Sequence, residues 1–335
     1  MDKNNKCNLS SPRLGTVGGQ AVLEGVMMKS KDKVALSVRD LNGNIQTEVT
    51  DFTSKKEKNK LFGLPLIRGV VNFVEMMILS FHTLTRSADM LGIEEEESKF
   101  EKWLTKKFGK SLTAVASVVG SVLGIGLSIL LFLYLPSLIS DLTIGKTADI
   151  KILKSLVEGV TKMAIFIAYV GLVGLIPDMK RTFQYHGAEH KSIFCHESEV
   201  ELTPKNVKKF SRFHPRCGTS FLVVMMVIGI LVSVFYINFP RPLRVATKLI
   251  TLPLIVALGY EFIRYAGKHN NLLVRILSAP GLWVQRLTTK EPDEKQIEVA
   301  IRSLKAALPD IYPEIIEELQ KNDNNELTDT TSEGQ

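Results

Sequence analysis

Cysteine is scarce in this chain, and several common catalytic signatures are absent. Three cysteines among 335 residues are too few for a disulfide scaffold. Cys7 falls in residues 1–11, which we expect to be flexible and, because they contain no apolar run, not to be a cleaved signal peptide. No Gly-x-Ser-x-Gly motif occurs, which argues against a serine-hydrolase nucleophile. The glycines within residues 15–19 do not match the dinucleotide-binding pattern either.

The charge distribution argues against a nucleic-acid-binding protein. The net charge is +7, but the basic residues lie in connectors between long apolar runs. In a membrane protein, such an excess reflects cytoplasmic Lys and Arg near anionic lipid. We therefore expect the lipid bilayer as a partner, and no nucleic acid.

Four apolar segments predict transmembrane helices. Residues 111–140 and 218–240 contain no charged residue, whereas the segments near 156–177 and 246–266 carry charges towards their ends. The loop 178–217 contains eight Lys or Arg residues, so the positive-inside rule places this loop and both termini in the cytoplasm. We expect residues 111–266 to form a transmembrane bundle with this cytoplasmic loop.

The remaining segments are more polar. Residues 12–60 predict a small soluble module that contains a β-hairpin, because two apolar strands flank Asn42-Gly43. Residues 267–320 predict cytoplasmic amphipathic helices, and residues 321–335 predict a disordered tail. The expected fold is thus mostly α-helical: a polytopic membrane bundle of about four helices and one interfacial helix, with a small N-terminal module.

The interfacial helix is expected over residues 61–90. Polar residues recur there every seven positions, so they form a narrow stripe on an otherwise apolar helix. The members of this polar stripe at that spacing are Arg68, Glu75, His82 and Asp89. Basic flanks on both sides favour a helix that lies in the membrane interface. Alternatively, the helix packs in the bundle with its stripe turned towards protein partners.

The most distinctive chemistry lies between His186 and Cys217. His186 and His190 belong to a His-x-x-Glu-His motif, and on a helix they share one face, so both can bind one metal ion. Glu189 lies beside that face and is the candidate general base. This spacing is that of the inverted zinc peptidases.

Further candidate ligands follow in the same loop. His214 and Cys217 are separated by two residues, which lets both reach one ion from a single turn, and Cys195 follows His190 closely. One possible set is His186, His190, His214 and Cys217, and Cys195 can replace one member. Imidazole and thiolate donors favour a divalent metal, zinc first. Four protein ligands would make a structural site, and three plus water a catalytic one; the sequence leaves both open.

Three motifs resemble those of the YqhQ-like bacterial membrane proteins, over residues 12–310. They are Gly18–Met28, Tyr185–Lys191 and His214–Ser220. That family carries the label of predicted metal-dependent enzymes. The resemblance therefore implies a bacterial inner-membrane protein with a metal-dependent activity.

Two functions remain open from the sequence. The first is a metal-dependent hydrolase at the cytoplasmic membrane surface, with a lipid or a membrane peptide as substrate. Residues expected to bind substrate or orient the ligands are Glu24, Glu75, His82, Glu261 and Arg216. The second is a non-enzymatic membrane factor, for example in membrane-protein biogenesis, in which a structural metal closes the loop and the soluble modules bind a membrane protein partner or client.

Overall fold

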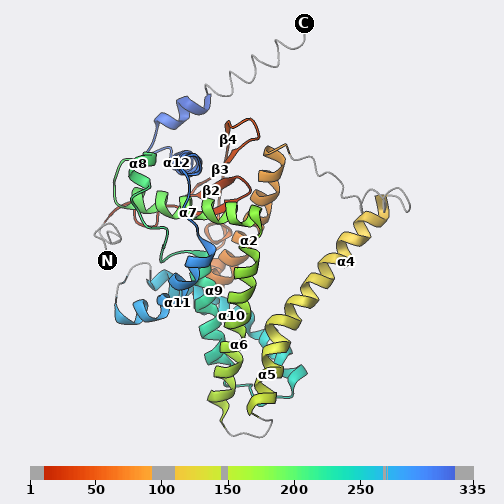
Figure 1. Cartoon of the computed structure of the whole chain (residues 1–335). Helices are drawn as coiled ribbons and strands as arrows, with labels where there is room; N and C mark the ends of the chain where they lie inside the picture. The colour runs from red at the N-terminus through yellow and green to blue at the C-terminus, as the bar shows by residue number, and fades with distance from the viewer. Residues whose placement is uncertain (1–10, 93–109, 145–149, 267–268, 270, 321–335) are drawn as a thin grey trace.

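The computed structural model describes residues 11–92, 110–144, 150–266, 269 and 271–320. The expected flexible N-terminus, with Cys7, and the expected disordered tail 321–335 lie outside these residues, except for Ser11. In Figure 1 the sheet, α7 and α12 lie together at one end of a group of long helices, while α4 runs away from the others. The metal candidates of the sequence lie at the end where the sheet is.

The N-terminal sheet has four antiparallel strands in sequence order. They are β1 (Gly18–Val22), β2 (Gly25–Lys29), β3 (Lys33–Arg39) and β4 (Ile45–Asp51). The predicted hairpin at Asn42-Gly43 is confirmed: β3 pairs with β4, and Gly43 adopts a positive φ of 91° that suits glycine. The first hairpin was not predicted, because its glycine-rich strand lacks a clear alternation. Its turn places Glu24 at a φ of 46°, a conformation that a residue with a Cβ rarely adopts.

Two helices cover this sheet. The helix α12 (Glu294–Ala307) begins at a capping box formed by Asp293 and Gln296 and packs against β2 and β3. The helix α7 (Pro177–Glu197) packs against α12 and β1. Apolar residues from the sheet and from both helices share one core. Segments that are distant in the sequence, the N-terminal module, the predicted loop and the C-terminal helices, are therefore packed together.

The other elements are mostly long apolar helices. They are α1 (Lys55–Lys58), η2 (Lys60–Gly63), α2 (Ile67–Met90), α4 (Lys110–Ile129), η3 (Leu130–Tyr134), α5 (Leu135–Ile144), α6 (Lys151–Val173), α8 (Pro204–Val207), α9 (Gly218–Ser233), α10 (Arg241–Ala266) and α11 (Leu272–Thr288). Four stretches are long and apolar enough to cross a membrane: 67–90, 119–144, 152–173 and 241–266. The expected mostly helical fold with a small sheet is confirmed, and these four helices are compatible with a membrane protein.

The set of long helices differs from the expected one in two places. The apolar helix α9 has 16 residues, about 24 Å at 1.5 Å per residue, which is shorter than a hydrocarbon core of about 30 Å. It ends at Ser233, and the rest of the predicted span 218–240 forms turns before Pro240. In contrast, α2, expected to be interfacial, has 24 residues and is long enough to span.

The polar stripe on α2 finds partners within the protein. The guanidinium of Arg68 donates two hydrogen bonds of 2.6 Å to the carboxylate of Glu261 on α10. Glu75 is buried and accepts hydrogen bonds from Ser54 Oγ at 2.7 Å and from the Lys55 amide at 2.5 Å. His82 is exposed. These contacts favour the interpretation in which the stripe faces protein, and they place Glu75, His82 and Glu261 on α2 and α10, outside the His/Cys cluster.

Candidate metal centre

The helix α7 carries the His-x-x-Glu-His motif, as the spacing predicts. Pro177 occupies its first turn, where the missing amide costs no hydrogen bond. Gly187 allows the segment that follows α11 to approach, because a Cβ at this position would lie 2.0 Å from the carbonyl oxygen of Lys290. The Lys290 amide in turn donates to the carbonyl oxygen of Phe183 at 2.8 Å. This close contact sets the position of residues 288–290 beside the two histidines.

Three of the predicted ligands come together. One donor atom each of His186, His190 and Cys217 lies within 4.8 Å of the other two, and His186 Nε2 is 3.3 Å from Cys217 Sγ. It is the one such group that the described residues form. Two imidazoles and one thiolate are a donor set suited to zinc and similar divalent metals.

Backbone carbonyls orient both imidazoles. His186 Nδ1 is 2.9 Å from the carbonyl oxygen of Thr288, and His190 Nδ1 is 2.6 Å from that of Arg212. A carbonyl can only accept, so in each ring Nδ1–H donates and Nε2 is the nitrogen that can bind a metal once it is deprotonated. Metal-binding histidines characteristically donate their second ring N–H in this way. Both rings are therefore prepared to bind through Nε2.

Cys217 lies at the N-terminus of α9, where its Sγ accepts from the Thr219 amide at 3.4 Å. Burial opposes ionisation of the thiol, but His190 and His186 bring its pKa well below the usual range. The partial positive charge of the helix N-terminus acts in the same direction. Burial likewise opposes protonation of His186, yet the Cys217 thiolate raises the pKa of His186 to about 9. Without a metal, the pair is thus a thiolate beside an imidazolium.

Glu189 lies on α7 between the two histidines and interacts electrostatically with His186, His190 and Cys217, although it is not one of the three converging donors. Its side chain is buried, with 4% of its surface exposed, and its Oε2 has no hydrogen-bond partner. Burial raises the pKa of Glu189, and the neighbouring His186 and His190 act against this rise. A buried carboxylate oxygen without a donor is costly, which points to a bound group that is not part of the chain.

The structure does not bring His214 into the cluster. Its Nδ1 accepts from the Arg216 amide at 3.3 Å, and its Nε2 lies 3.4 Å from Glu197 Oε2, so both ring nitrogens are engaged. Burial, together with the positive charge of Arg216, lowers the pKa of His214 to about 4. The neutral ring therefore donates to Glu197 and has no lone pair left for a metal.

Cys195 also lies apart from the three ligands. Its thiol is buried and donates to the carbonyl oxygens of Val200 and Glu201, both at 3.6 Å. Burial raises its pKa to about 12, so the thiol stays protonated. His196 is likewise occupied, by the hydroxyl of Tyr312 at 2.9 Å and that of Thr16 at 3.0 Å.

Glu24 and Arg216 form ion pairs that hold segments around the site in place. Glu24 accepts a bidentate contact from Arg181 and a 3.2 Å hydrogen bond from the Tyr185 hydroxyl, which ties the β1–β2 turn to α7. Arg216, next to Cys217, donates to the carboxylate of Glu197. Both residues thus hold elements in place, and neither belongs to the ligand cluster.

Glu197 is the residue that the sequence analysis missed. Burial alone would raise its pKa, but the hydrogen bond from His214 and the charge of Arg216 lower it to about 2. Its Oε1 also accepts from the Gly15 amide at 2.9 Å, so one carboxylate connects α7, the residues before α9 and the N-terminal segment. The available signal was its position seven residues after His190, two helical turns along the same face. Backbone carbonyls, such as that of Thr288, leave no signal in a sequence.

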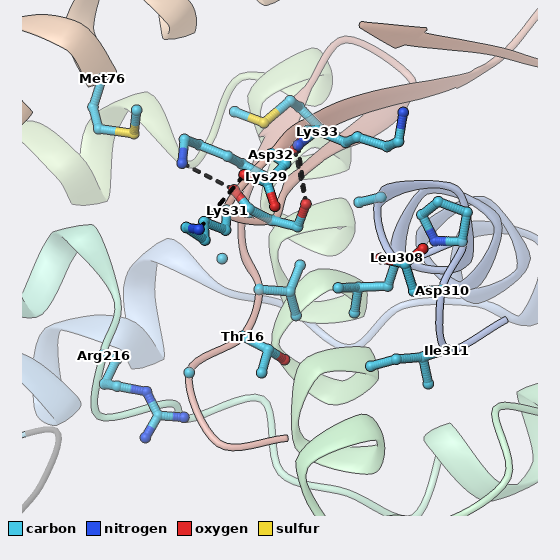
Figure 2. Close-up of a pocket in the computed structure, with 18 residues that line it drawn as sticks. Thr16, Lys29, Lys31, Asp32, Lys33, Met76, Arg216, Leu308, Asp310 and Ile311 are labelled. Atoms are coloured by element: carbon cyan, nitrogen blue, oxygen red, sulfur yellow. Dashed lines mark hydrogen bonds and ion pairs between the residues drawn. The ribbon is translucent and has the colours of Figure 1, made fainter. Parts of the chain in front are cut away.

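A cavity of about 710 Å³ lies between the sheet and the segment after α12, and none of the three candidate ligands lines it. Figure 2 shows Thr16, Arg216, the Lys29–Lys33 turn and Asp310 around it. Gly19 also lines this cavity, and a Cβ on Gly19 would lie 2.8 Å from Glu189 Cγ. The lining contains four basic and two acidic residues. The lining of the cavity thus has a net positive charge, and Gly19 connects the cavity to Glu189.

Comparisons with known proteins identify the family without naming a reaction. The family described as "Protein of unknown function (DUF1385)" matches residues 64–310. The "Uncharacterized protein YqhQ" of Bacillus subtilis (strain 168) is 31% identical over 293 residues, which cover 87% of this chain and 92% of the relative. No solved structure matches the chain. The chain therefore belongs to the DUF1385 family and is similar to YqhQ over most of its length.

Proposed function

We propose that this protein is a metal-dependent hydrolase, in which His186, His190 and Cys217 hold a divalent metal, zinc first, and Glu189 acts as the general base. The observation that carries the proposal is the combination of three converging donor atoms with an adjacent carboxylate that lacks a partner. Three protein ligands leave one coordination position open, which is typical of catalytic zinc sites, whereas structural sites are closed by four.

The position of His214 supports a catalytic site over a structural one. A four-ligand set required His214 or Cys195 as the closing donor. Both ring nitrogens of His214 have other partners, and the Cys195 thiol stays protonated and donates to two backbone carbonyls. Glu197 and Arg216 hold His214 in this arrangement. The fourth position is then left to water or substrate.

When bound, a divalent metal would supply a Lewis acid and lower the pKa of water in its coordination sphere. The carbonyls of Thr288 and Arg212 keep both imidazoles turned towards the metal. Glu189 is buried and its pKa is raised by that burial, which suits a base that accepts a proton from water and returns it to a leaving group. The basic cavity beside Gly19 would bind an anionic substrate.

We place the reaction at the cytoplasmic face of a bacterial inner membrane. The sheet, the predicted loop 178–217, rich in Lys and Arg, and α12 pack together at one end of the long helices, so an even number of crossings separates each pair of them. Residues 119–144 and 152–173 would cross between the sheet and the loop, and α9 and α10 between the loop and α12, whereas α2 would not cross completely. The positive-inside rule then puts this end and both termini in the cytoplasm. A substrate at this surface would be a lipid or a membrane-embedded peptide.

A non-enzymatic membrane factor is the second candidate. It draws on the same cluster, with the metal serving to hold α7 against α9. One observation argues against client binding through the polar stripe of α2: Arg68 and Glu75 have intramolecular partners. A scaffold role would thus depend on the soluble surface and not on α2.

Metal analysis combined with X-ray absorption tests the proposal. Purified wild-type protein should contain one metal per chain, with two nitrogen donors, one sulfur donor and one further light atom. His186→Ala should lose the metal, while Glu189→Gln should keep it and lose activity in the membrane. His269→Ala is the matched control, because His269 is exposed and lies outside the cluster.

Activity can be followed without a known substrate. Lipids and small membrane peptides from cells that contain wild-type protein or Glu189→Gln are compared by mass spectrometry, and a species that accumulates only in the variant is the substrate. A wild-type protein without stoichiometric metal would overturn the proposal. Four protein donors, or a Glu189→Gln protein that behaves as wild type, would instead identify a structural metal.

A further inference from the structure

A second cavity lies among the long apolar helices. Its volume is about 230 Å³, and its lining comes from η3, α6, α9, α10 and Tyr236. Along α9 it extends from Leu222 to Ser233, the last residue of that helix. None of His186, His190 and Cys217 lines it. The cavity is therefore a separate feature from the candidate active site.

Charged residues lie at one end of this cavity. Lys248 on α10 forms an ion pair with Glu158 on α6 and donates to Ser137 Oγ at 2.8 Å. Glu158 is 3% exposed, yet its Oε2 has no hydrogen-bond partner. Lys162, one turn along α6, also lines the cavity, and no contact with another described residue satisfies its ammonium group. The cavity thus contains one unused acceptor and one unused cation.

The surroundings add positive charge. Asp141 on α5 accepts hydrogen bonds from Arg244 at 2.5 Å and from Arg241 at 3.2 Å. Lys154 Nζ lies 4.0 Å from Asp141 Oδ1. This region of the helices thus contains two carboxylates and five cations. The carboxylates are Asp141 and Glu158, and the cations are Lys154, Lys162, Arg241, Arg244 and Lys248. Charges buried among apolar helices seek partners and mark functional sites. The excess of cations favours an anion as the missing partner.

The other lining is apolar. It includes Phe166 on α6, Leu222 and Met225 on α9, and Leu252 on α10. A site that is charged at one end and apolar at the other fits an amphiphile better than a free ion. The volume is below the usual range of about 300 Å³ and more for pockets that enclose a drug-sized ligand. It therefore suits a head group with the start of its chains, and not a whole lipid.

We propose that this cavity binds the head group of a lipid that carries both a negative charge and free hydroxyl groups. Lys162 pairs with the anionic group, which gives its ammonium the partner that the chain does not provide. A ligand hydroxyl donates to Glu158 Oε2, the unused acceptor. Ser155 and Ser233 also line the cavity, but their hydroxyls are bonded to each other at 2.6 Å and Ser233 donates to the carbonyl oxygen of Ile230, so neither donates to the ligand. The acyl chains lie against the apolar lining and continue into the bilayer.

Binding to the purified full chain in a neutral detergent tests this site. Radiolabelled dihexanoylphosphatidylglycerol has the required anion and hydroxyls; dihexanoylphosphatidylcholine has neither a net charge nor hydroxyls, and glycerol phosphate has the head-group chemistry without chains. Equilibrium gel filtration should show one-to-one binding of the first probe and binding at least about tenfold weaker of the other two. The choline lipid lacks the hydroxyl that donates to Glu158, a charge-assisted contact, and glycerol phosphate lacks the chains that bury apolar surface.

Two variants probe the cavity directly. Lys162→Met removes the charge at similar length and should weaken binding about tenfold or more. Gly229→Leu should fill the cavity, because Gly229 lines it and a Cβ there would meet only Ile255 Cδ1, at 3.8 Å. Gly120→Leu on α4 is the control, since no atom lies within 4 Å of its Cβ position. Thermal melts confirm that each variant is folded.

The proposal is overturned if the choline lipid binds as tightly as the glycerol lipid, or if Lys162→Met binds as wild type. Tight binding of glycerol phosphate alone would identify a soluble-anion site and would equally reject the lipid. The comparison of probes on wild-type protein needs no variant and stays decisive if a variant fails to fold. Metal content is measured in parallel and should be unchanged, so this test is independent of the proposed hydrolase.

Discussion

Replacing Gly187 by alanine should damage the metal centre without touching a ligand. Gly187 follows His186 on α7, and a Cβ there would lie 2.0 Å from the carbonyl oxygen of Lys290. Backbone on both sides of the contact must then separate, since the Lys290 amide is also bonded to Phe183 on α7 at 2.8 Å. The methyl group therefore pushes residues 288–290 away from the helix.

Two opposing effects set the size of the change in stability. Alanine has a higher helix propensity than glycine, which stabilises a helix by about 1 kcal/mol. Overpacking of a closely packed contact costs about 1–3 kcal/mol. We expect Gly187→Ala to lower the stability by up to about 2 kcal/mol. Gly171→Ala on α6 should show the helical gain alone, because nothing lies within 4 Å of its Cβ position.

The larger effect should be on metal binding. Thr288, whose carbonyl holds His186 Nδ1 at 2.9 Å, lies on the displaced segment. Loss of such an orienting contact typically reduces metal affinity about 10–100-fold. Gly187→Ala should therefore bind metal more weakly while His186, His190 and Cys217 are all still present.

Thermal melts in detergent and competition with a chelator measure the two effects. Gly187→Ala should melt below wild type and release its metal at a lower chelator concentration, whereas Gly171→Ala should match wild type in metal affinity. A Gly187→Ala protein as stable and as metal-retentive as Gly171→Ala would refute the packing of α7 on residues 288–290.

Three further predictions follow from contacts around the site and on α2. The pKa of Glu197 is about 2 in the folded chain against an ordinary 4.5. The ionised carboxylate therefore stabilises the folded chain by at most roughly 3 kcal/mol, fully above pH 4.5 and less as the pH falls towards 2. Between pH 7 and pH 3 the melting temperature should fall less in Glu197→Gln than in wild type, and equal slopes would contradict this. A double-mutant cycle on Arg68→Gln and Glu261→Gln should give a coupling of about 0.5–3 kcal/mol in detergent, and no coupling would show that α2 and α10 do not pair there. In a Cys7→Ser variant, Cys217 should react with a maleimide only after a chelator has removed the metal, and Cys195 only after the chain is unfolded. Mass spectrometry of the labelled peptides checks both.

The ligand chemistry was predictable because it depends on local spacing. His186, Glu189 and His190 lie within five residues, so helical geometry alone brings the two imidazoles to one face. The turn at Asn42-Gly43 was predictable for the same reason, because the short turn needs a positive φ, which Gly43 provides. The long apolar runs likewise predicted most of the long helices, since their length and composition are local properties.

The choice among the ligands depended on tertiary packing. The sequence contains His214 at a suitable spacing from Cys217, yet Glu197 and the Arg216 amide occupy its ring, and no spacing rule reports such partners. The carbonyl of Thr288, 102 residues after His186, orients a ligand through backbone that is chemically alike at every residue.

The arrangement of α2 was likewise decided in three dimensions. Its polar stripe was visible in the sequence, but the partner of Arg68 is Glu261, 193 residues away. The amino-acid sequence by itself thus determined which groups can bind a metal and which segments are apolar, because both depend on neighbours along the chain. Only the folded chain decided which groups meet, because distant segments supply the partners that occupy some donors and leave His186, His190 and Cys217 together.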